Sequence, residues 1–289
     1  MTAFDQLGTE ARDAAGADLD LRSTLELVEL MNAADAAVPA AVGVAANDIA
    51  RLIDAVAERL AAGGRLVYAG AGTSGRLAAL DASEVGPTFS AGDRVIAVAA
   101  EREPEEDDAK GGVCGIEALR ISAADAVVGI SASGRSPYVR GALEAARTAG
   151  ALTGCVVCVE GSELAALADH EVCIPVGAEV LAGSTRLKAG TAQKLVLNMI
   201  STIAMVRLGK TYGNLMVDLD ASNEKLQARV RSIVGHATGA APDAVDQALA
   251  AAGGDAKVAI VSLLARVDAD EARARLTDAS GIVRRAVES

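Results

Sequence analysis

Short apolar runs alternate with helical patterns through the middle of the chain, and this alternation constrains the fold more than any other feature. The runs are rich in Val, Ile, Ala and Cys and are bounded by glycine or polar loops, at residues 65–69, 94–99, 126–130, 155–159 and 171–174. Strands that are apolar almost without interruption belong to parallel sheets covered by helices on both faces. The sequence therefore predicts an α/β fold whose ligand site lies at the carboxyl ends of the strands.

Helical patterns precede and follow the predicted sheet. Ser23 and Glu26 form a capping-box pattern, and an amphipathic pattern over 47–62 ends at Gly63. A long helix is expected over 187–208, and the alanine-rich remainder also has a helical pattern. We therefore divide the chain into an N-terminal helical segment (1–52), a sheet domain (53–218) and a small C-terminal helical domain (219–289).

Charge and apolar patterning disfavour several classes of partner. The formal net charge is −12 and no long Lys/Arg run is present, so nucleic-acid binding is not expected. The first twenty residues carry acids and lack the apolar core of a signal peptide. The apolar stretch 195–206 is short and has polar flanks, so no membrane span is expected. These features predict a cytoplasmic protein, and one that binds anions through local backbone N–H groups and hydroxyls.

Cys155 and Cys158 have the spacing of a redox or metal pair. They lie in an apolar run that is predicted as a strand, where side chains three residues apart point to opposite faces. Buried structural thiols are therefore expected, and no metal site is predicted. His170 and His236 lack neighbours with ligand-like spacing, so they are expected to be structural or exposed.

A glycine loop follows the first predicted strand and opens a helix. Its sequence, Gly70-Ala-Gly-Thr-Ser-Gly-Arg76, fits the G-x-G-x-x-G pattern in the strand–loop–helix context that dinucleotide binding requires. Glycines let the backbone approach an anion, and the helix N-terminus supplies N–H donors. Glu101, which follows the second strand, could supply the acid that a dinucleotide site needs. A nicotinamide-dependent dehydrogenase is one hypothesis for this loop.

Two later loops favour a sugar phosphate over a dinucleotide. Ser131-Ala-Ser-Gly-Arg-Ser136 follows the third strand, and Gly183-Ser-Thr-Arg186 precedes the long helix. All three loops are expected at one edge of the sheet, where hydroxyls suit phosphate and sugar oxygens. The simpler alternative is that Ser and Thr only cap helices, and one hydroxyl can do both.

These motifs resemble the N-acetylmuramic acid 6-phosphate etherases of the sugar-isomerase (SIS) superfamily. The resemblance rests on the glycine loop followed by Leu80-Asp-Ala-Ser-Glu84, on Ser133-Gly-Arg-Ser-Pro-Tyr138, and on the very specific block Gly183–Lys194. Tyr212-Gly-Asn-Leu-Met-Val-Asp218 extends it over nearly the whole chain. The resemblance implies a SIS-type, flavodoxin-like parallel sheet, a homodimer with an interfacial site, no cofactor and no metal.

The implied reaction splits the D-lactyl ether of N-acetylmuramic acid 6-phosphate by elimination and hydration during cell-wall recycling. By resemblance, Glu84 is the acid that assists lactate departure, and Glu106 is the base at C2. The segment between them is shorter than the family usually shows, so Glu105, Glu103 and Glu101 stay open as alternatives for the base. Seven further residues are expected to bind the amino-sugar phosphate: Gly72, Thr73, Ser74, Ser131, Ser133, Ser184 and Thr185.

Two other assignments stay open at this point. Lys188 and Lys194 either touch substrate or only lie on the long helix. The SIS superfamily also contains non-catalytic regulators that bind sugar phosphates, so a sensor is the alternative to an enzyme.

Overall fold

The computed structural model describes residues 8, 11–13, 16–100, 102–219 and 224–289. Contacts within the chain separate two compact units, each of which is described by itself. The first comprises Met1–Ser83 and Arg94–Ser201, and the second comprises Glu84–Asp93 and Thr202–Ser289. Two helices, α4 (Gly72–Phe89) and α7 (Lys188–Arg207), contribute to both units. The domain boundaries given above, at residues 52/53 and 218/219, stay a prediction.

The first unit is built around a five-stranded parallel sheet with the strand order β2-β1-β3-β4-β5. Its strands are β1 (Leu66–Ala71), β2 (Val95–Ala100), β3 (Ala126–Ser131), β4 (Leu152–Val157) and β5 (His170–Cys173). Its remaining helices are α1 (Thr24–Asp35), α2 (Val38–Val44), α3 (Ala46–Ala61), α5 (Ala109–Ala118) and α6 (Pro137–Thr148). The order 2-1-3-4-5 is that of flavodoxin-like sheets, so the predicted fold is confirmed.

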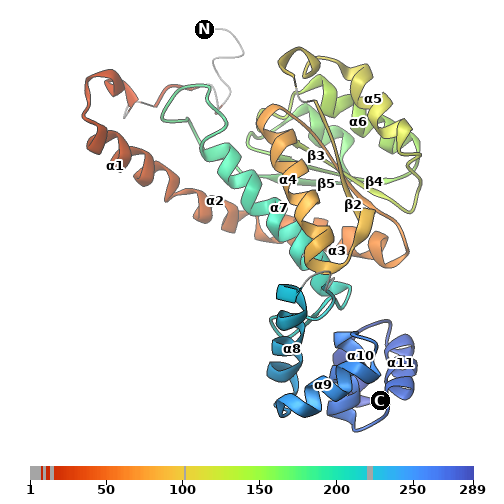
Figure 1. The fold of residues 1–289 in the computed structure, drawn as a ribbon. Coiled ribbons are helices and arrows are strands. Elements are labelled where there is room, and N and C mark those ends of the chain that lie inside the picture. Colours follow the sequence, from red (N-terminus) through yellow and green to blue (C-terminus); the bar gives the residue numbers. More distant parts are fainter. Residues whose placement is uncertain (1–7, 9–10, 14–15, 101, 220–223) are drawn as a thin grey trace. The chain divides into compact units, whose positions relative to one another are not determined.

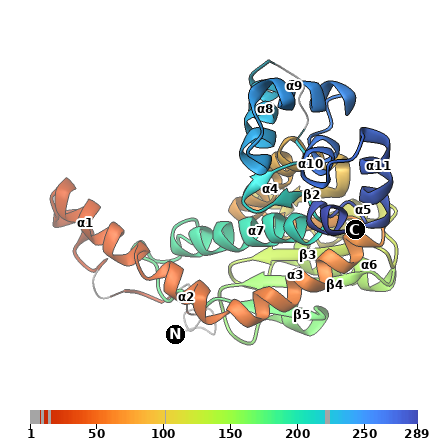
Figure 2. The same ribbon diagram turned by 90° about the horizontal axis from the view of Figure 1, so that it is seen from below.

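Helices cover both faces of this sheet (Figures 1 and 2). On one face, Val67 and Ala69 of β1 pack in a cluster with Ile116 of α5 and Leu143 of α6. On the other face α3 contacts β1, β4 and β5. Tyr68, fully buried, points to that second face, where its hydroxyl donates to Asp81 Oδ2 of α4 at 3.2 Å. Because α4 follows β1 on one face and α6 follows β3 on the other, the sheet changes winding direction between these two strands, which is where such folds bind ligands.

Most of the predicted elements of this unit are confirmed to within two residues. The capping box of Ser23 and Glu26 is formed, and Gly63 ends α3 with a φ of +90°. The prediction for β4 was wrong at both ends, because pairing with β3 starts at Leu152 and stops at Val157. Cys158 is buried beyond the strand end, where its N–H donates to the carbonyl of Ala132. The apolar run therefore predicts which residues are buried, but not which residues form the hydrogen bonds of the sheet.

The two cysteines of the C-x-x-C spacing are free, buried and on opposite faces, as predicted. Cys155 packs in the cluster with α5 and α6, and Cys158 Sγ lies 3.9 Å from the carbonyl oxygen of Ala189 in α7. Burial raises the pKa of each thiol to about 12. A thiol with such a pKa is inert as a nucleophile or metal ligand at neutral pH.

The N-terminal helices differ in how much of them is buried. The apolar face of α3, which includes Leu52, Val56 and Leu60, is fully buried. In contrast, α1 buries none of its residues, and Leu25 and Val28 are 66% and 58% exposed. The α1 helix therefore keeps large apolar side chains exposed, whereas α3 buries them.

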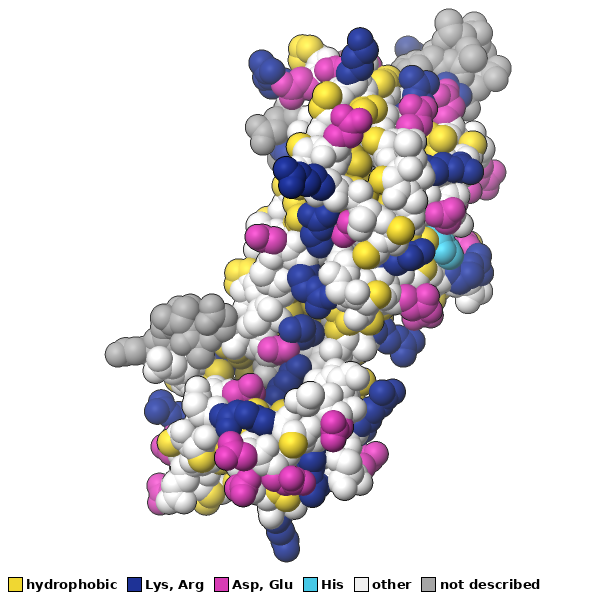
Figure 3. All heavy atoms as spheres, turned by 90° about the vertical axis from the view of Figure 1, so that its right-hand side faces the viewer, with side chains coloured by type: hydrophobic (Ala, Val, Ile, Leu, Met, Phe, Trp, Pro, Cys, Tyr) yellow, Lys and Arg dark blue, Asp and Glu magenta, His cyan; other side chains and the backbone are white. Residues whose placement is uncertain are grey.

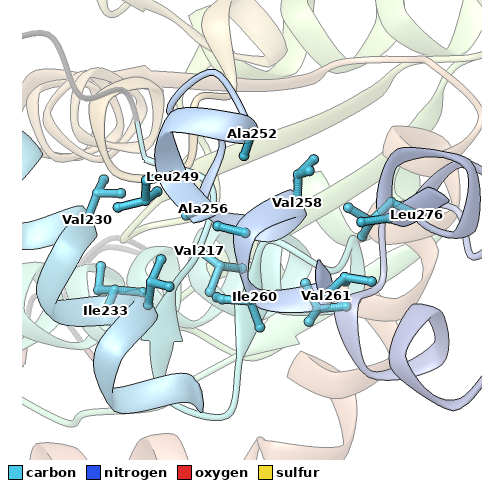
Figure 4. Packing of buried hydrophobic residues seen from close by; sticks show 14 of the residues in the cluster. Val217, Val230, Ile233, Leu249, Ala252, Ala256, Val258, Ile260, Val261 and Leu276 are labelled. Carbon is cyan, nitrogen blue, oxygen red and sulfur yellow. The ribbon is translucent and has the colours of Figure 1, made fainter. Parts of the chain in front are cut away.

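The second unit is a small helical domain with a short hairpin. It contains β6 (Thr211–Tyr212) paired antiparallel with β7 (Leu215–Met216), and α8 (Glu224–Thr238), α9 (Pro242–Ala251), α10 (Ala256–Ala265), α11 (Ala269–Asp278) and α12 (Val283–Glu288). Figure 4 shows Val217, Ile233, Leu249, Ile260 and Leu276 meeting in its core. The carboxylate of Asp218 binds the ammonium groups of Lys210 and Lys257, each at 2.8 Å, and ties the hairpin to α10.

Candidate functional site

The glycine loop after β1 forms a close approach between strand and helix. α4 begins at Gly72, directly after the strand, and Gly72 has a φ of +55°, which favours glycine. A Cβ on Gly75 would lie 2.8 Å from the carbonyl oxygen of Gly70 and 3.0 Å from Cβ of Ala99. Glycines at 70 and 75 therefore hold the first turn of α4 against β1. The N–H groups of such a first turn have no partner within the helix and suit an anion.

The hydroxyls of this loop differ in how they are used. Thr73 is half-buried, and its Oγ1 accepts from the guanidinium of Arg76 at 3.2 Å. Ser74 is 8% exposed, and its hydroxyl donates to Oε1 of Gln193 in α7 at 2.9 Å. A Cβ on Gly190 of α7 would lie 3.6 Å from Cγ2 of Thr73. The start of α7, and with it the third predicted loop, therefore lies beside the first loop.

Glu106 is held between the first and second loops. Its carbonyl oxygen accepts from the N–H of Tyr138 at 3.1 Å and from Oγ of Ser136 at 3.4 Å, at the start of α6. Its carboxylate oxygen Oε2 lies 3.5 Å from the position of a Cβ on Gly72. The backbone contacts of Glu106 thus place its carboxylate against the glycine loop.

The neighbouring acids have different surroundings. Glu105 accepts from Nε of Arg102 at 2.6 Å, within its own short turn, and Arg102 is exposed. Glu101 lies outside the described residues, and the same holds for the side chain of Glu103. Among the acids of this run whose side chains the structure describes, Glu106 is therefore the best placed to act at the glycine loop.

The second loop is ordered by its own hydroxyls. Ser131, 5% exposed, accepts from the N–H of Gly134 at 3.1 Å, and Ser133 accepts from the N–H of Arg135 at 3.4 Å. Accepting uses a lone pair on each oxygen and not its proton, so both hydroxyls keep a donor for a ligand. The parallel pairing of β1 with β3 places this loop next to the first loop, because Gly70 near the end of β1 lies opposite Ile130 near the end of β3.

The third loop is closed by a residue that sequence reasoning missed. Glu179 is fully buried, and its two carboxylate oxygens accept from the N–H groups of Lys188 and Ala189, each at 3.0 Å. This carboxylate occupies the N-terminus of α7, so anion binding at the third loop depends on the half-buried Ser184 and Thr185. No local pattern identifies Glu179, because it lies nine residues before the helix that it caps.

The two open lysines have partners within the first unit. Lys188 is 8% exposed, and its Nζ donates to the carbonyl oxygen of Val176 at 2.8 Å. Lys194 Nζ donates to Oδ1 of Asn198, one turn further along α7, at 2.9 Å. Lys188 therefore anchors the chain before α7, and Lys194 lies on the helix surface.

Glu84 is exposed and belongs to the second unit. The helix opened by the glycine loop does not end at Glu84, because α4 continues through Pro87 to Phe89. The hydroxyl of Thr88 donates to the carbonyl oxygen of Glu84 at 2.7 Å, next to the position where Pro87 supplies no N–H. Glu84 thus lies more than three helical turns after Gly72 on the same helix.

Other features of the described residues bear on ligands and partners. No group of three or more His, Cys, Asp or Glu side chains in the described part of the chain is placed to hold a metal ion. A hollow of about 1290 Å³ lies in the second unit, and its described lining includes Pro87, Arg231 and Asp246 but none of the nine predicted site residues. On the face shown in Figure 3, acidic and basic side chains are interspersed.

Residues 48–147 match the family described as the glucokinase regulatory protein N-terminal SIS domain. Several relatives align over nearly their full length and are named N-acetylmuramic acid 6-phosphate etherase. The protein of Rubrobacter xylanophilus is 56% identical over 98% of this chain and 96% of its own. That of Streptomyces coelicolor is 52% identical (98% and 94%), and that of Escherichia coli O1:K1 / APEC is 45% identical (99% and 99%).

The chain also has solved structural relatives. A phosphoheptose isomerase from Francisella tularensis superimposes with a TM-score of 0.53 at 18% identity, over 64% of this chain and 100% of its own. At this identity the match supports the fold alone.

Proposed function

The chain belongs to the N-acetylmuramic acid 6-phosphate etherases, and from this premise we propose how its residues cleave the D-lactyl ether of N-acetylmuramic acid 6-phosphate. The activity makes it a carbon–oxygen lyase that yields N-acetylglucosamine 6-phosphate and D-lactate. The observation that carries the mechanism is the carboxylate of Glu106, held 3.5 Å from a Cβ position on Gly72 by contacts to the start of α6. Cell-wall recycling in the cytoplasm stays our prediction for the setting of the reaction.

Glu106 is the base in this proposal. In the open-chain sugar the C2 proton lies alpha to the aldehyde, so its removal gives a stabilised enolate. The electron pair at C2 then forms the C2–C3 double bond as the bond from C3 to the lactyl oxygen breaks. Proton transfer by a positioned carboxylate contributes about 10²–10⁴-fold to such a step.

Glu84 is the acid. It protonates the departing lactyl oxygen and, as a carboxylate, then takes a proton from the water that adds at C3, while C2 regains a proton. The sum of these steps is the substrate plus one water giving the two products. Two carboxylates in different surroundings divide acid and base work in this way.

The three hydroxyl-rich loops bind the substrate in this proposal. The first turn of α4, with Gly72, Thr73 and Ser74, suits the phosphate because the N–H groups at a helix N-terminus have no partner within the helix. Four hydroxyls of the other loops are proposed to bind phosphate or sugar oxygens: Ser131, Ser133, Ser184 and Thr185. Such binding by neutral donors is what a chain with a net charge of −12 requires.

We infer that the active form is a homodimer. Two observations support it: Glu84 is exposed and belongs to the second unit, and α1 buries none of its residues. The segment Thr24–Val44 is long and apolar enough to cross a membrane by length and composition, with 11% of its window buried. The acids Glu26 and Glu29 on α1 disfavour an anionic lipid surface, so we propose that a second subunit covers this helix.

Sedimentation velocity tests the homodimer. The unaltered protein is expected as a dimer, and Val28→Glu, which puts a charge on the exposed apolar face of α1, is expected to shift it to monomer and lower activity. Ala33→Glu is the matched charge control, because Ala33 is also exposed on α1 but lies about 140° around the helix from Val28. A monomeric unaltered protein with full activity contradicts the inference.

Release of D-lactate tests the function itself. The purified protein is given N-acetylmuramic acid 6-phosphate, and lactate is followed with a coupled D-lactate dehydrogenase. Stoichiometric lactate is expected. Saturable sugar-phosphate binding without lactate would identify a sensor, and tight NADH binding would favour a dehydrogenase.

A further inference from the structure

The amide of Gln193 is buried between α7 and the glycine loop with one of its two polar atoms unpaired. Gln193 is 1% exposed, and its Oε1 accepts the hydroxyl proton of Ser74 at 2.9 Å. Its Nε2 is enclosed and has no hydrogen-bond partner among the residues that the structure describes. A buried donor without a partner costs roughly 1–3 kcal/mol, so its presence beside the predicted phosphate loop requires a reason.

The arrangement leaves Ser74 unsuited to bind an anion. A phosphate oxygen accepts hydrogen bonds and does not donate them, and the proton of Ser74 is engaged by Gln193. A half-turn of the amide exchanges its two polar atoms. Nε2 then donates to Oγ of Ser74, and the proton of Ser74 becomes available to a ligand. Oε1 becomes the atom without a partner in that state, so each orientation of the amide leaves one of its two polar atoms unpaired.

Hydrogen bonds hold the helix that carries Gln193 in place. Two turns further along α7, Ser201 donates to Oδ1 of Asp81 at 3.0 Å, and Asp81 also accepts from Tyr68 of β1 at 3.2 Å. These partly buried hydrogen bonds fix α7 against α4 and the sheet. Rotation of the Gln193 amide about its terminal torsion, which is soft, is therefore the low-cost change.

We propose that Gln193 is a positioning residue whose amide, by turning its Nε2 toward Ser74, aims the Ser74 proton at the substrate phosphate. The proposal rests on the etherase function and on Ser74 as a phosphate donor, and it adds a residue that acts through Ser74. A carboxamide suits this role because, at this size, it can both accept the Ser74 proton and donate to Ser74 Oγ, whereas a carboxylate only accepts. In the free protein it holds the Ser74 proton inward, and with the phosphate bound it releases that proton.

Two substitutions separate this role from packing. Gln193→Glu keeps the shape and the acceptor but removes the donor, so the Ser74 proton stays engaged. It is expected to weaken binding of N-acetylglucosamine 6-phosphate by about ten- to a hundred-fold, the range of a charge-assisted hydrogen bond. Gln193→Met keeps the volume and releases the Ser74 proton, and it is expected to bind within about three-fold of the unaltered protein. A packing role predicts the reverse order.

Calorimetric titration with N-acetylglucosamine 6-phosphate is the experiment, with N-acetylglucosamine as the matched ligand without phosphate. The loss in Gln193→Glu is expected for the phosphorylated ligand alone. In a Ser74→Ala background the same substitution is expected to cost less than about five-fold, since only repulsion between charges remains. An undiminished effect in that background, or a loss in Gln193→Met as large as in Gln193→Glu, overturns the proposal.

The titration also distinguishes failure of the proposal from failure of the etherase function. If the unaltered protein releases lactate and binds the ligand while Gln193→Glu binds equally well, the positioning role is wrong and the function stands. If Gln193→Glu does not fold, Gln193→Met decides, because a loss of affinity of about ten-fold there contradicts a role exerted through the Ser74 proton.

Discussion

Replacing Glu179 by glutamine tests whether a buried carboxylate organises the third loop. Each carboxylate oxygen accepts one N–H at the start of α7, from Lys188 and from Ala189, at 3.0 Å. Glutamine keeps one neutral acceptor and turns its NH₂ group toward the second N–H. One charge-assisted hydrogen bond is therefore lost and the other becomes a neutral one.

The magnitude follows from those two bonds. Losing a hydrogen bond to a charged group costs roughly 1.5–3 kcal/mol, and weakening the second one costs about 1 kcal/mol. The favourable placement of negative charge at the helix N-terminus is lost as well. We expect Glu179→Gln to lower the free energy of unfolding by about 3 kcal/mol and Tm by roughly 6–12 °C, for a unit of this size.

Thermal and urea denaturation followed by circular dichroism measure this loss. Glu117→Gln in α5 is the control, because Glu117 is exposed and its replacement is expected to change stability by less than about 0.5 kcal/mol. A Glu179→Gln protein as stable as this control would refute the reasoning. Michaelis constants for the variant should rise more than kcat falls, since Ser184 and Thr185 lie in the loop that Glu179 caps.

Two further predictions concern packing and charge. Gly75→Ala places a Cβ 2.8 Å from the backbone of β1 and is expected to destabilise the protein by about 1–3 kcal/mol. Gly43→Ala in α2, with open space around it, should stabilise the protein by about 0.5–1 kcal/mol. Denaturation curves compare the two variants. Burial acts to raise the pKa of Asp218, but hydrogen bonds from Lys210 and Lys257 more than offset it and hold the pKa below its ordinary value. Asp218→Asn should therefore lower the free energy of unfolding by about 1–2 kcal/mol at neutral pH. This loss of stability should shrink as the pH falls through and below the unfolded-state pKa of about 3.9. A loss that stays constant down to about pH 2 would contradict the linkage.

The architecture of the first unit could be predicted because local patterns and the fold agree. Apolar runs predicted the strands, and the glycine loop predicted the passage from β1 into α4. The start of β4 was missed because Thr153 is polar and yet fully buried, with its hydroxyl donating to the carbonyl of Leu167 at 2.9 Å. A hydropathy pattern cannot show that a polar side chain is buried with its hydroxyl hydrogen-bonded.

The site residues whose place the sequence could not predict have their contacts far away along the chain. Glu106 stands in a run of acids that no periodicity separates, and its position depends on hydrogen bonds to residues about thirty positions away, Ser136 and Tyr138. Gln193 owes its role to Ser74, 119 positions away. The exposure of α1, which buries none of its residues, could not be predicted from its apolar side chains.

The most direct test of the proposed chemistry measures D-lactate release together with exchange of the C2 proton in deuterated water. We predict that Glu84→Gln stops lactate release but still exchanges the C2 proton, whereas Glu106→Gln loses both by about 10²–10⁴-fold. Glu105→Gln, the control beside it, should retain both activities. A Glu106→Gln protein that releases lactate at the normal rate would contradict the account and move the base to a neighbouring acid.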